Sequence, residues 1–196
     1  MLYVIAHFFR DRLPWLWNLI EILNSVLFSL RYGKRMSSIE VPSFYEGFTI
    51  SPMRETAVEA LVAFFARQPE DTYKFFKPHG FDVDSIERLQ RNKAFLAYTA
   101  MDGSKVVGYC FIRAFFHGSG FRGRMVDINY RGKKLGTAMN RILDDVGFGI
   151  GLRLFETVNK DNVASYRSAL AASKVKVIKE FDDGDLYLEI IADNQK

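Results

Sequence analysis

The sequence predicts a mixed α/β fold of the α+β type, preceded by an amphipathic helix. Short apolar stretches alternate with helical periodicities between residues 44 and 191, and no repeat or low-complexity tract interrupts them. Two Asp-Gly dipeptides stand between neighbouring strand patterns, as hairpin turns require. We therefore divide the 196 residues into an amphipathic helical segment, residues 1–40, and one folded domain, residues 41–196.

The first segment contains an apolar helix with one narrow polar stripe. Residues 13–30 read LPWLWNLIEILNSVLFSL, in which the polar residues recur every three or four positions at Asn18, Glu21, Ser25 and Ser29. A charged residue near the centre makes a transmembrane span unfavourable. Two alternatives remain: an interfacial helix with Trp15 and Trp17 at the lipid headgroups, or a helix that packs on its own domain or on a second copy in a homodimer.

The first half of the domain is predicted to contain one strand and two helices. Residues 48–50 form the strand, and Ser51-Pro52 is expected to cap a helix whose apolar face is Val58, Leu61, Val62 and Phe65. Pro69 ends this helix. An aromatic loop, residues 72–81, precedes a second helix that opens with the capping box Asp84-x-x-Glu87.

The second half of the domain is predicted to be richer in strands. Residues 95–100 and 105–115 form a hairpin that turns at Asp102-Gly103, and residues 124–129 form a third strand. A helical stripe follows at Leu135, Met139, Ile142, Leu143 and Val146. The remaining elements are a strand at 152–158, a helix at 162–172, and a hairpin of residues 175–181 and 185–191.

Composition excludes several classes of function. Apolar residues make up 48% and charged residues 26% of the chain, which is typical of a globular protein. The net charge of +4 is too mild to indicate a nucleic-acid partner, although residues 1–36 hold five Lys or Arg against two Asp or Glu. Three His and one Cys cannot build a Cys/His zinc cluster or an internal disulfide. We expect no metal and a cytoplasmic protein, which the interfacial helix would hold at the inner membrane face.

The most informative motif is a strand that leads through YRGKKLG directly into a helix, within residues 125–143. Backbone N–H groups of such a loop, reinforced by the helix dipole, form an anion-binding site. Lys133 and Lys134 add positive charge, and Gly132 and Gly136 permit close approach of a ligand. The motif predicts a phosphate or pyrophosphate site, unless the glycines serve only the turn.

This run resembles the acetyl-coenzyme A signature of the GNAT N-acetyltransferase superfamily, Arg/Gln-x-x-Gly-x-Gly/Ala, which stands here at residues 131–136. The order of elements from 44 to 191 also resembles that fold. The resemblance implies a mostly antiparallel sheet flanked by helices and acetyl-CoA as co-substrate. It further implies acetyl transfer to the amine of a small molecule, such as an amino sugar, by direct attack in a ternary complex. Lys134 departs from the motif's first Gly, and Ala169 stands where many members carry a Tyr.

The resemblance also implies which residues bind the co-substrate. The main chain at Val126 and Ile128 would hydrogen-bond the pantetheine arm, to which Asn162 would add a side-chain contact. The pyrophosphate would lie on the loop and first helical turn, which comprise Arg131, Gly132, Lys133, Lys134, Leu135, Gly136 and Thr137.

Acetyl transfer needs a base that takes the ammonium proton and a group that protonates the departing thiolate. Glu156, Asp127 and His117 are the candidate bases, and Tyr166 is the candidate acid one turn before Ala169. The alternatives are exposed strand polarity for the first three and a core aromatic for Tyr166. A non-catalytic GNAT-like module that binds an acyl-CoA or a partner is the alternative function.

Aromatic side chains in the loop of residues 72–81 are candidates for the acceptor pocket. Tyr73, Phe75, Phe76 and His79 would line a pocket for a small amine, or else act as lid and core aromatics. Cys110 lies inside an apolar strand pattern and is expected to serve packing alone.

Overall fold

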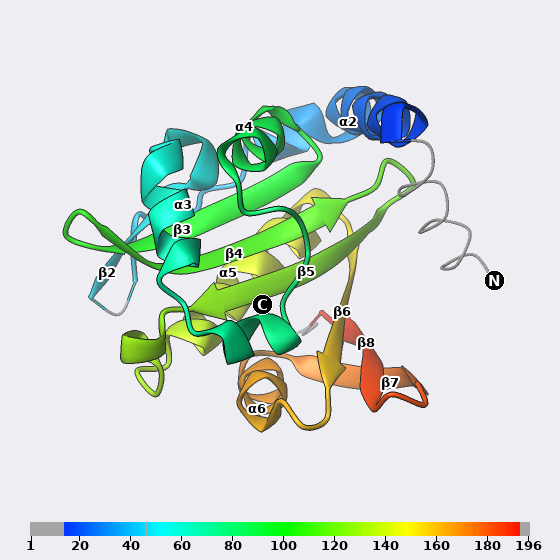
Figure 1. Cartoon of the computed structure of the whole chain (residues 1–196). Helices are drawn as coiled ribbons and strands as arrows, with labels where there is room; N and C mark the ends of the chain where they lie inside the picture. The colour runs from blue at the N-terminus through cyan, green and yellow to red at the C-terminus, as the bar shows by residue number, and fades with distance from the viewer. Residues whose placement is uncertain (1–13, 46, 193–196) are drawn as a thin grey trace.

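The computed structural model describes residues 14–45 and 47–192 (Figure 1). One mixed sheet in this part of the chain has the strand order β1-β2-β3-β4-β5-β6-β8-β7. Its strands are β1 (Phe44–Tyr45), β2 (Phe48–Pro52), β3 (Phe95–Asp102), β4 (Lys105–Ala114), β5 (Ser119–Val126), β6 (Arg153–Asn159), β7 (Lys174–Glu180) and β8 (Asp185–Ile191). All neighbouring strands are antiparallel except β5 and β6, which are parallel. The predicted fold class is confirmed.

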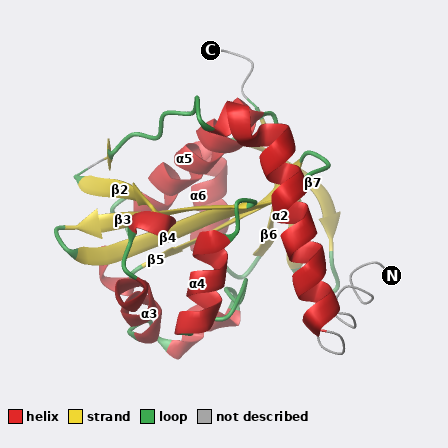
Figure 2. Cartoon of the chain, turned by 90° about the horizontal axis from the view of Figure 1, so that it is seen from above, coloured by secondary structure: helices red, strands yellow, loops and turns green. Residues whose placement is uncertain are grey.

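Helices cover both faces of the sheet. They are α2 (Pro14–Met36), α3 (Val58–Ala66), α4 (Val83–Arg91), α5 (Leu135–Ile150) and α6 (Val163–Ala172), with 3-10 turns η1 (Met53–Glu55), η2 (Glu70–Lys74) and η3 (Ile128–Tyr130). Figure 2 shows α5 and α6 on one side of the sheet and α3 and α4 on the other. Apolar side chains of β3 and β4 pack on both faces, so these central strands separate two cores. Burial raises the pKa of Cys110 in β4 to about 12, as expected of a residue that serves packing.

Three predicted element boundaries are wrong. Ser51 and Pro52 end β2, and α3 begins at Val58 after η1 without a side-chain cap. The cap of α4 is Asp82, whose carboxylate accepts from the Ser85 backbone N–H at 2.9 Å, instead of Asp84. The strand predicted at 124–129 begins at Ser119, because residues 120–126 pair with β4, and it ends at Val126.

The helix α2 packs on its own domain, with its polar side inward. The Asn24 amide donates to Ala114 O at 2.9 Å and accepts from Phe116 N at 3.0 Å. The Ser25 hydroxyl accepts from Lys93 N at 2.9 Å. The side chains of Phe28 and Tyr32 complete the contact inside the core. Polar side chains on α2 therefore satisfy backbone groups at the ends of β3 and β4.

Part of the predicted N-terminal segment cannot be placed on this structure. Residues 1–13 of that segment and the side chain of Trp15, which was predicted to lie at the lipid headgroups, lie outside the described residues. No helix in the described part of the chain combines the length and apolar character that a membrane crossing needs.

Candidate functional site

The parallel strands β5 and β6 pair over only three residues each and then diverge. Their pairing runs from Ser119↔Arg153 to Phe121↔Phe155. Beyond it lies a cleft of about 1380 Å³ between β5, β6, the N-terminus of α5, α6 and residues 69–77. The edge of β5 that faces this cleft has no strand partner past Phe121, so an extended ligand could add to the sheet there.

One end of the cleft is formed by the loop before α5. Gly132 has a φ of 78° and Lys134 a φ of 59°, so both adopt the left-handed conformation. Among the described residues, no backbone N–H of 132–136 donates a hydrogen bond, and the first to do so is Thr137 N to Lys134 O at 3.0 Å. Free N–H groups at a helix N-terminus attract an anion.

Lys134 occupies the position where the resemblance leads one to expect glycine. A left-handed conformation costs a non-glycine residue roughly 1–2 kcal/mol, but Lys134 adopts it nonetheless. The loop thus retains its turn, and the lysine adds a positive charge to the cleft lining.

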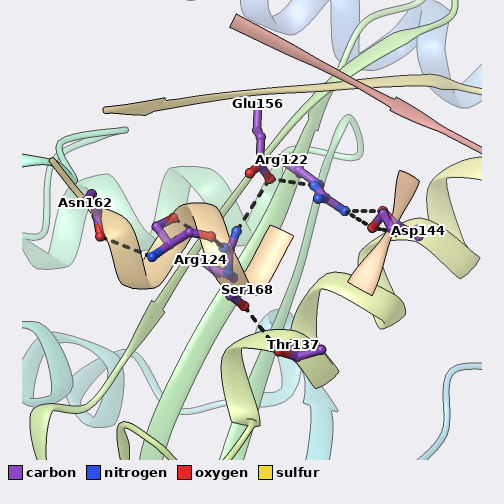
Figure 3. Close-up of polar contacts among 9 residues, drawn as sticks. Arg122, Arg124, Thr137, Asp144, Glu156, Asn162 and Ser168 are labelled. Atoms are coloured by element: carbon purple, nitrogen blue, oxygen red, sulfur yellow. Dashed lines mark hydrogen bonds and ion pairs between the residues drawn. The ribbon is translucent and has the colours of Figure 1, made fainter. Parts of the chain in front are cut away.

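The helices α5 and α6 approach closely at this end of the cleft. A Cβ atom on Gly136 would lie 3.2 Å from Ser168 Oγ and 3.7 Å from Val126 Cγ2. The hydroxyls of Thr137 and Ser168 lie 3.4 Å apart (Figure 3). Glycine at 136 therefore leaves room between the two helices and β5.

A buried network of arginines and carboxylates lies where β5 and β6 separate. Arg122 Nε donates to Glu156 Oε2 at 2.7 Å, and its Nη1 forms an ion pair with Asp144 (Figure 3). Arg124 Nη1 lies 3.4 Å from the same Glu156 oxygen, and Arg124 Nη2 donates to Ser165 O at 2.7 Å. Burial raises the pKa of Asp144 even though Arg122 lies beside it.

Two atoms of this network have no hydrogen-bond partner among the described residues: Arg122 Nη2 and Glu156 Oε1. Both side chains are buried, with exposed fractions of 0% and 3%, and both residues line the cleft. A buried polar group without a partner costs about 1–3 kcal/mol. Both atoms are also closed to solvent, so a ligand reaches them only after the surrounding side chains move.

Nine of the ten residues predicted to bind the co-substrate line this cleft. They are Val126, Ile128, Arg131, Gly132, Lys134, Leu135, Gly136, Thr137 and Asn162. The exception is Lys133, whose ammonium lies 4.7 Å from the centre of the Tyr130 ring. Asn162 also caps α6, since its side-chain oxygen accepts from Ser165 N at 3.2 Å.

Of the four candidate catalytic residues, only Glu156 lines the cleft. The Asp127 carboxylate is buried and forms an ion pair with Arg67 at 2.8 Å. Burial opposes ionisation of Asp127, but hydrogen bonds from Arg67 and Asn129 outweigh it and lower the pKa. His117 is exposed and stacks on Phe115 in the turn between β4 and β5.

Tyr166 points toward the sheet instead of the cleft. Its ring packs with Val158, Leu186 and Leu188, which matches the alternative of a core aromatic. Ala169, the position where many GNAT members carry a tyrosine, is fully buried. The cleft-facing surface of α6 thus has no tyrosine among the residues that line the cleft.

The aromatic loop divides between the cleft and the core. Phe75 and Phe76 line the cleft. The Tyr73 hydroxyl donates to Phe65 O, and its ring packs on Phe81. His79 Nδ1 donates to Gly80 O at 2.7 Å and its Nε2 accepts from Tyr109 at 2.9 Å, which leaves the neutral ring fully hydrogen-bonded. For Tyr73 and His79, the core alternative agrees with the structure.

The burial of His79 makes the stability of the fold depend on pH. Burial lowers its pKa from 6.5 to about 4, so between these values the unfolded chain binds a proton that the folded chain does not. The free energy of unfolding should fall by on the order of 2–3 kcal/mol from pH 6.5 to pH 4 through this group. Urea unfolding of the parent and of His79→Gln, each at pH 6.5 and at pH 4, measures the difference. The same loss of unfolding free energy in both proteins would contradict the prediction.

The sequence analysis did not predict that these arginines and carboxylates form one buried network. Arg122 and Arg124 stand two residues apart on one strand and so point to the same face. Asn140 and Asp144 lie one turn apart among the buried residues of α5, which is an unusual place for a carboxylate. These two patterns in the sequence could have indicated the network.

Among the described residues, no group of three or more His, Cys, Asp or Glu could hold a metal ion.

No protein-family model and no curated protein sequence matches the chain. Among solved structures, the ribosomal-protein-S5-alanine acetyltransferase from Vibrio fischeri is similar, with 15% identity and a TM-score of 0.64 over 80% of this chain and 98% of that one. The GNAT domain of S. lividans PAT has 16% identity and a TM-score of 0.61 over 73% and 89%. AAC(6')-Ib in complex with paromomycin and acetyl-CoA has 15% identity and a TM-score of 0.56 over 74% and 93%. Likeness at these identities establishes a shared fold.

Proposed function

We propose that this chain, which has the GNAT acetyltransferase fold, moves an acetyl group from acetyl-CoA to the amine of a small molecule in a ternary complex. The observation that carries the proposal is the row of free N–H groups at residues 132–136, at the end of a cleft between two diverging strands. An amino sugar is one acceptor of this class. The solved AAC(6')-Ib complex contains both acetyl-CoA and paromomycin, which supports an acceptor of this kind.

The pyrophosphate of acetyl-CoA would lie on the N–H groups of residues 132–136, where the Arg131 and Lys134 side chains line the cleft. The pantetheine arm would run along the unpaired edge of β5, with a main-chain hydrogen bond at Val126. The predicted main-chain contact at Ile128 is not retained, because Ile128 lies in η3 and its N–H donates to Gln68 Oε1 at 3.2 Å. This course leads from the loop before α5 toward Arg122 and Glu156. The thioester would then lie near the point where β5 and β6 separate.

Glu156 is the base that the cleft supports best. Its Oε2 is held by Arg122 and Arg124, whereas its Oε1 is unpaired. Once neighbouring side chains move to expose it, Oε1 would accept a proton from the acceptor ammonium, directly or through water, so that the neutral nitrogen attacks the thioester carbonyl carbon. The new C–N bond gives a tetrahedral oxyanion, whose collapse breaks the C–S bond, and the thiolate takes up the proton that the new amide nitrogen loses. A main-chain N–H on the unpaired edge of β5 beside the thioester would stabilise the oxyanion.

The test is to measure acetyl-CoA binding by calorimetry and release of the coenzyme thiol across a panel of amines. We expect micromolar binding and thiol release with at least one class of small amine. Absence of acetyl-CoA binding would refute the proposal. Binding without release from any amine would instead indicate the alternative, a non-catalytic module that binds an acyl-CoA or a partner, which the lack of a tyrosine on the cleft side of α6 favours.

Two roles of Asn162 can be separated with one matched pair of variants. Its oxygen caps α6, and its amide NH₂ donates no hydrogen bond within the described part of the chain. Asn162→Ser keeps a cap and should leave the free energy of unfolding nearly unchanged, whereas Asn162→Ala should lower it by about 1 kcal/mol. Both should weaken turnover by up to about tenfold, because one hydrogen bond to the ligand is lost.

Urea unfolding and the thiol-release assay, run on both variants, give the two readouts. Full activity in Asn162→Ser would assign the residue to the cap alone.

A further inference from the structure

We propose that the outer face of α2 binds the surface of an anionic lipid bilayer. The outer face consists of six apolar side chains, Leu19, Ile20, Ile22, Leu23, Val26 and Leu30. Their exposed fractions range from 47% for Ile20 to 79% for Leu30. Figures 1 and 2 show α2 at the periphery of the molecule. A continuous exposed apolar stripe is unusual for a monomeric protein and marks an interaction surface.

The polar side of α2 fixes this face outward. In addition to the contacts of Asn24 and Ser25, Arg31 Nη1 donates to Phe116 O at 3.0 Å and Arg35 Nη1 donates to Ile150 O at 3.2 Å. Phe28 and Tyr32 are buried on the same side. Rotation of α2 to bury its apolar stripe would break these hydrogen bonds and expose two core aromatics. The stripe is therefore held in place by the fold.

The charges around the outer face favour an anionic surface. The C-terminal part of α2 carries three exposed cations. Lys34 lies one turn after Leu30 and so borders the outer face, whereas Arg31 and Arg35 add positive charge from the inner side, where they donate to Phe116 O and Ile150 O. Its only described carboxylate, Glu21, lies 3.4 Å from Arg113 and is thus neutralised. An apolar stripe on a helix with a positively charged C-terminal end and no unpaired acid is typical of interfacial helices on anionic lipid.

A second copy of this chain fits the same face less well. Antiparallel pairing of two α2 helices would place these cations against residues 14–20 of the other copy, which contain no Asp or Glu. Parallel pairing would place cations against cations. A bilayer with anionic headgroups satisfies both the apolar stripe and the charges.

The outer face shares no residue with the cleft between β5 and β6. Lipid binding can therefore be tested without acetyl-CoA, and its failure would leave the proposed function untouched. The sequence of residues 1–13, MLYVIAHFFRDRL, is also apolar and contains two arginines. Deletion of residues 1–12 forms one arm of the test.

The experiment is co-sedimentation of the full-length protein with vesicles of phosphatidylglycerol and phosphatidylcholine in equal parts, and with vesicles of phosphatidylcholine alone. We expect binding that is stronger on the anionic vesicles and falls as salt is raised. Ile22→Glu/Val26→Glu should reduce this binding at least about tenfold, because two carboxylates enter the interface. Leu19→Gln/Leu30→Gln, which adds no charge, should weaken it in the same direction.

The matched control is Val177→Glu/Ile178→Glu, which changes two exposed apolar residues of β7. It should bind like the parent, and all variants should keep the parent's melting temperature. A parent that does not sediment with anionic vesicles, or equal binding by the α2 and β7 variants, would overturn the proposal. Sedimentation velocity without lipid identifies the occupant in that case: a dimer that Ile22→Glu/Val26→Glu dissociates, or a monomer that aggregates once residues 1–12 are removed.

Discussion

Gly136→Asp should lower the affinity of the chain for acetyl-CoA at least about a hundredfold, or roughly 2.7 kcal/mol. The new carboxylate would stand in the first turn of α5, next to free N–H groups that would otherwise bind the pyrophosphate. Two like charges about 4 Å apart repel by on the order of 4 kcal/mol at the dielectric of a protein surface. A negative charge in the first turn interacts favourably with the helix dipole, so α5 should stay folded.

Calorimetry with acetyl-CoA measures the loss, and thermal unfolding checks the fold. The matched control is Gly136→Asn, which has the same size without the charge. It should lose less affinity, because only the close approach to Ser168 Oγ, 3.2 Å from the new Cβ, is disturbed. Equal affinity of Gly136→Asp and the parent would remove the loop from the binding site.

Arg122→Met should lower the free energy of unfolding by about 3–5 kcal/mol. Arg122 is the ion-pair partner of both Glu156 and Asp144, and all three side chains are largely buried. Methionine fills a similar space but leaves Asp144 without a cation and Glu156 with Arg124 alone, in a region that water does not reach. Urea unfolding at pH 7 measures the difference.

Two further variants define the cause. Arg122→Met/Asp144→Asn removes the cation together with the carboxylate that would be left without one, keeps the Arg124–Glu156 pair, and should recover much of the loss. Arg153→Met breaks the pair with Glu189 at 2.6 Å, in which Arg153 is 71% exposed, and should cost less than about 1 kcal/mol. If Arg122→Met lowered the free energy of unfolding no more than Arg153→Met, burial would not make the network important for stability.

The local sequence pattern was sufficient to predict the loop that joins a strand to α5. A strand, a Gly-containing turn and an amphipathic helix follow one another within residues 125–143, so their geometry depends on neighbours in the chain. The residues of this stretch that line the cleft, such as Val126 and Gly136, could therefore be named from the sequence, and their role in binding stays a prediction. The left-handed Lys134 shows that the turn persists even where its sequence departs from the motif.

The destinations of single polar side chains could not be predicted in the same way. Asp127 pairs with Arg67, sixty residues earlier in the chain, and Tyr166 packs on β8. The polar stripe of α2 was visible, but its inward orientation depends on backbone groups at Ala114, Phe116 and Ile150. Nothing in residues 14–36 records those distant partners.

The short pairing of β5 with β6 has a consequence for hydrogen–deuterium exchange. Three residue pairs join these strands, whereas six join β6 to β8. The sheet is thus two cooperative units joined by the short β5–β6 pairing. The amide protons of β6, β7 and β8 should exchange together, and sooner than those of β3 and β4. A ligand in the cleft would contact both units and so stabilise their association. Acetyl-CoA should therefore slow exchange in β6 and β8, well beyond the residues that it contacts.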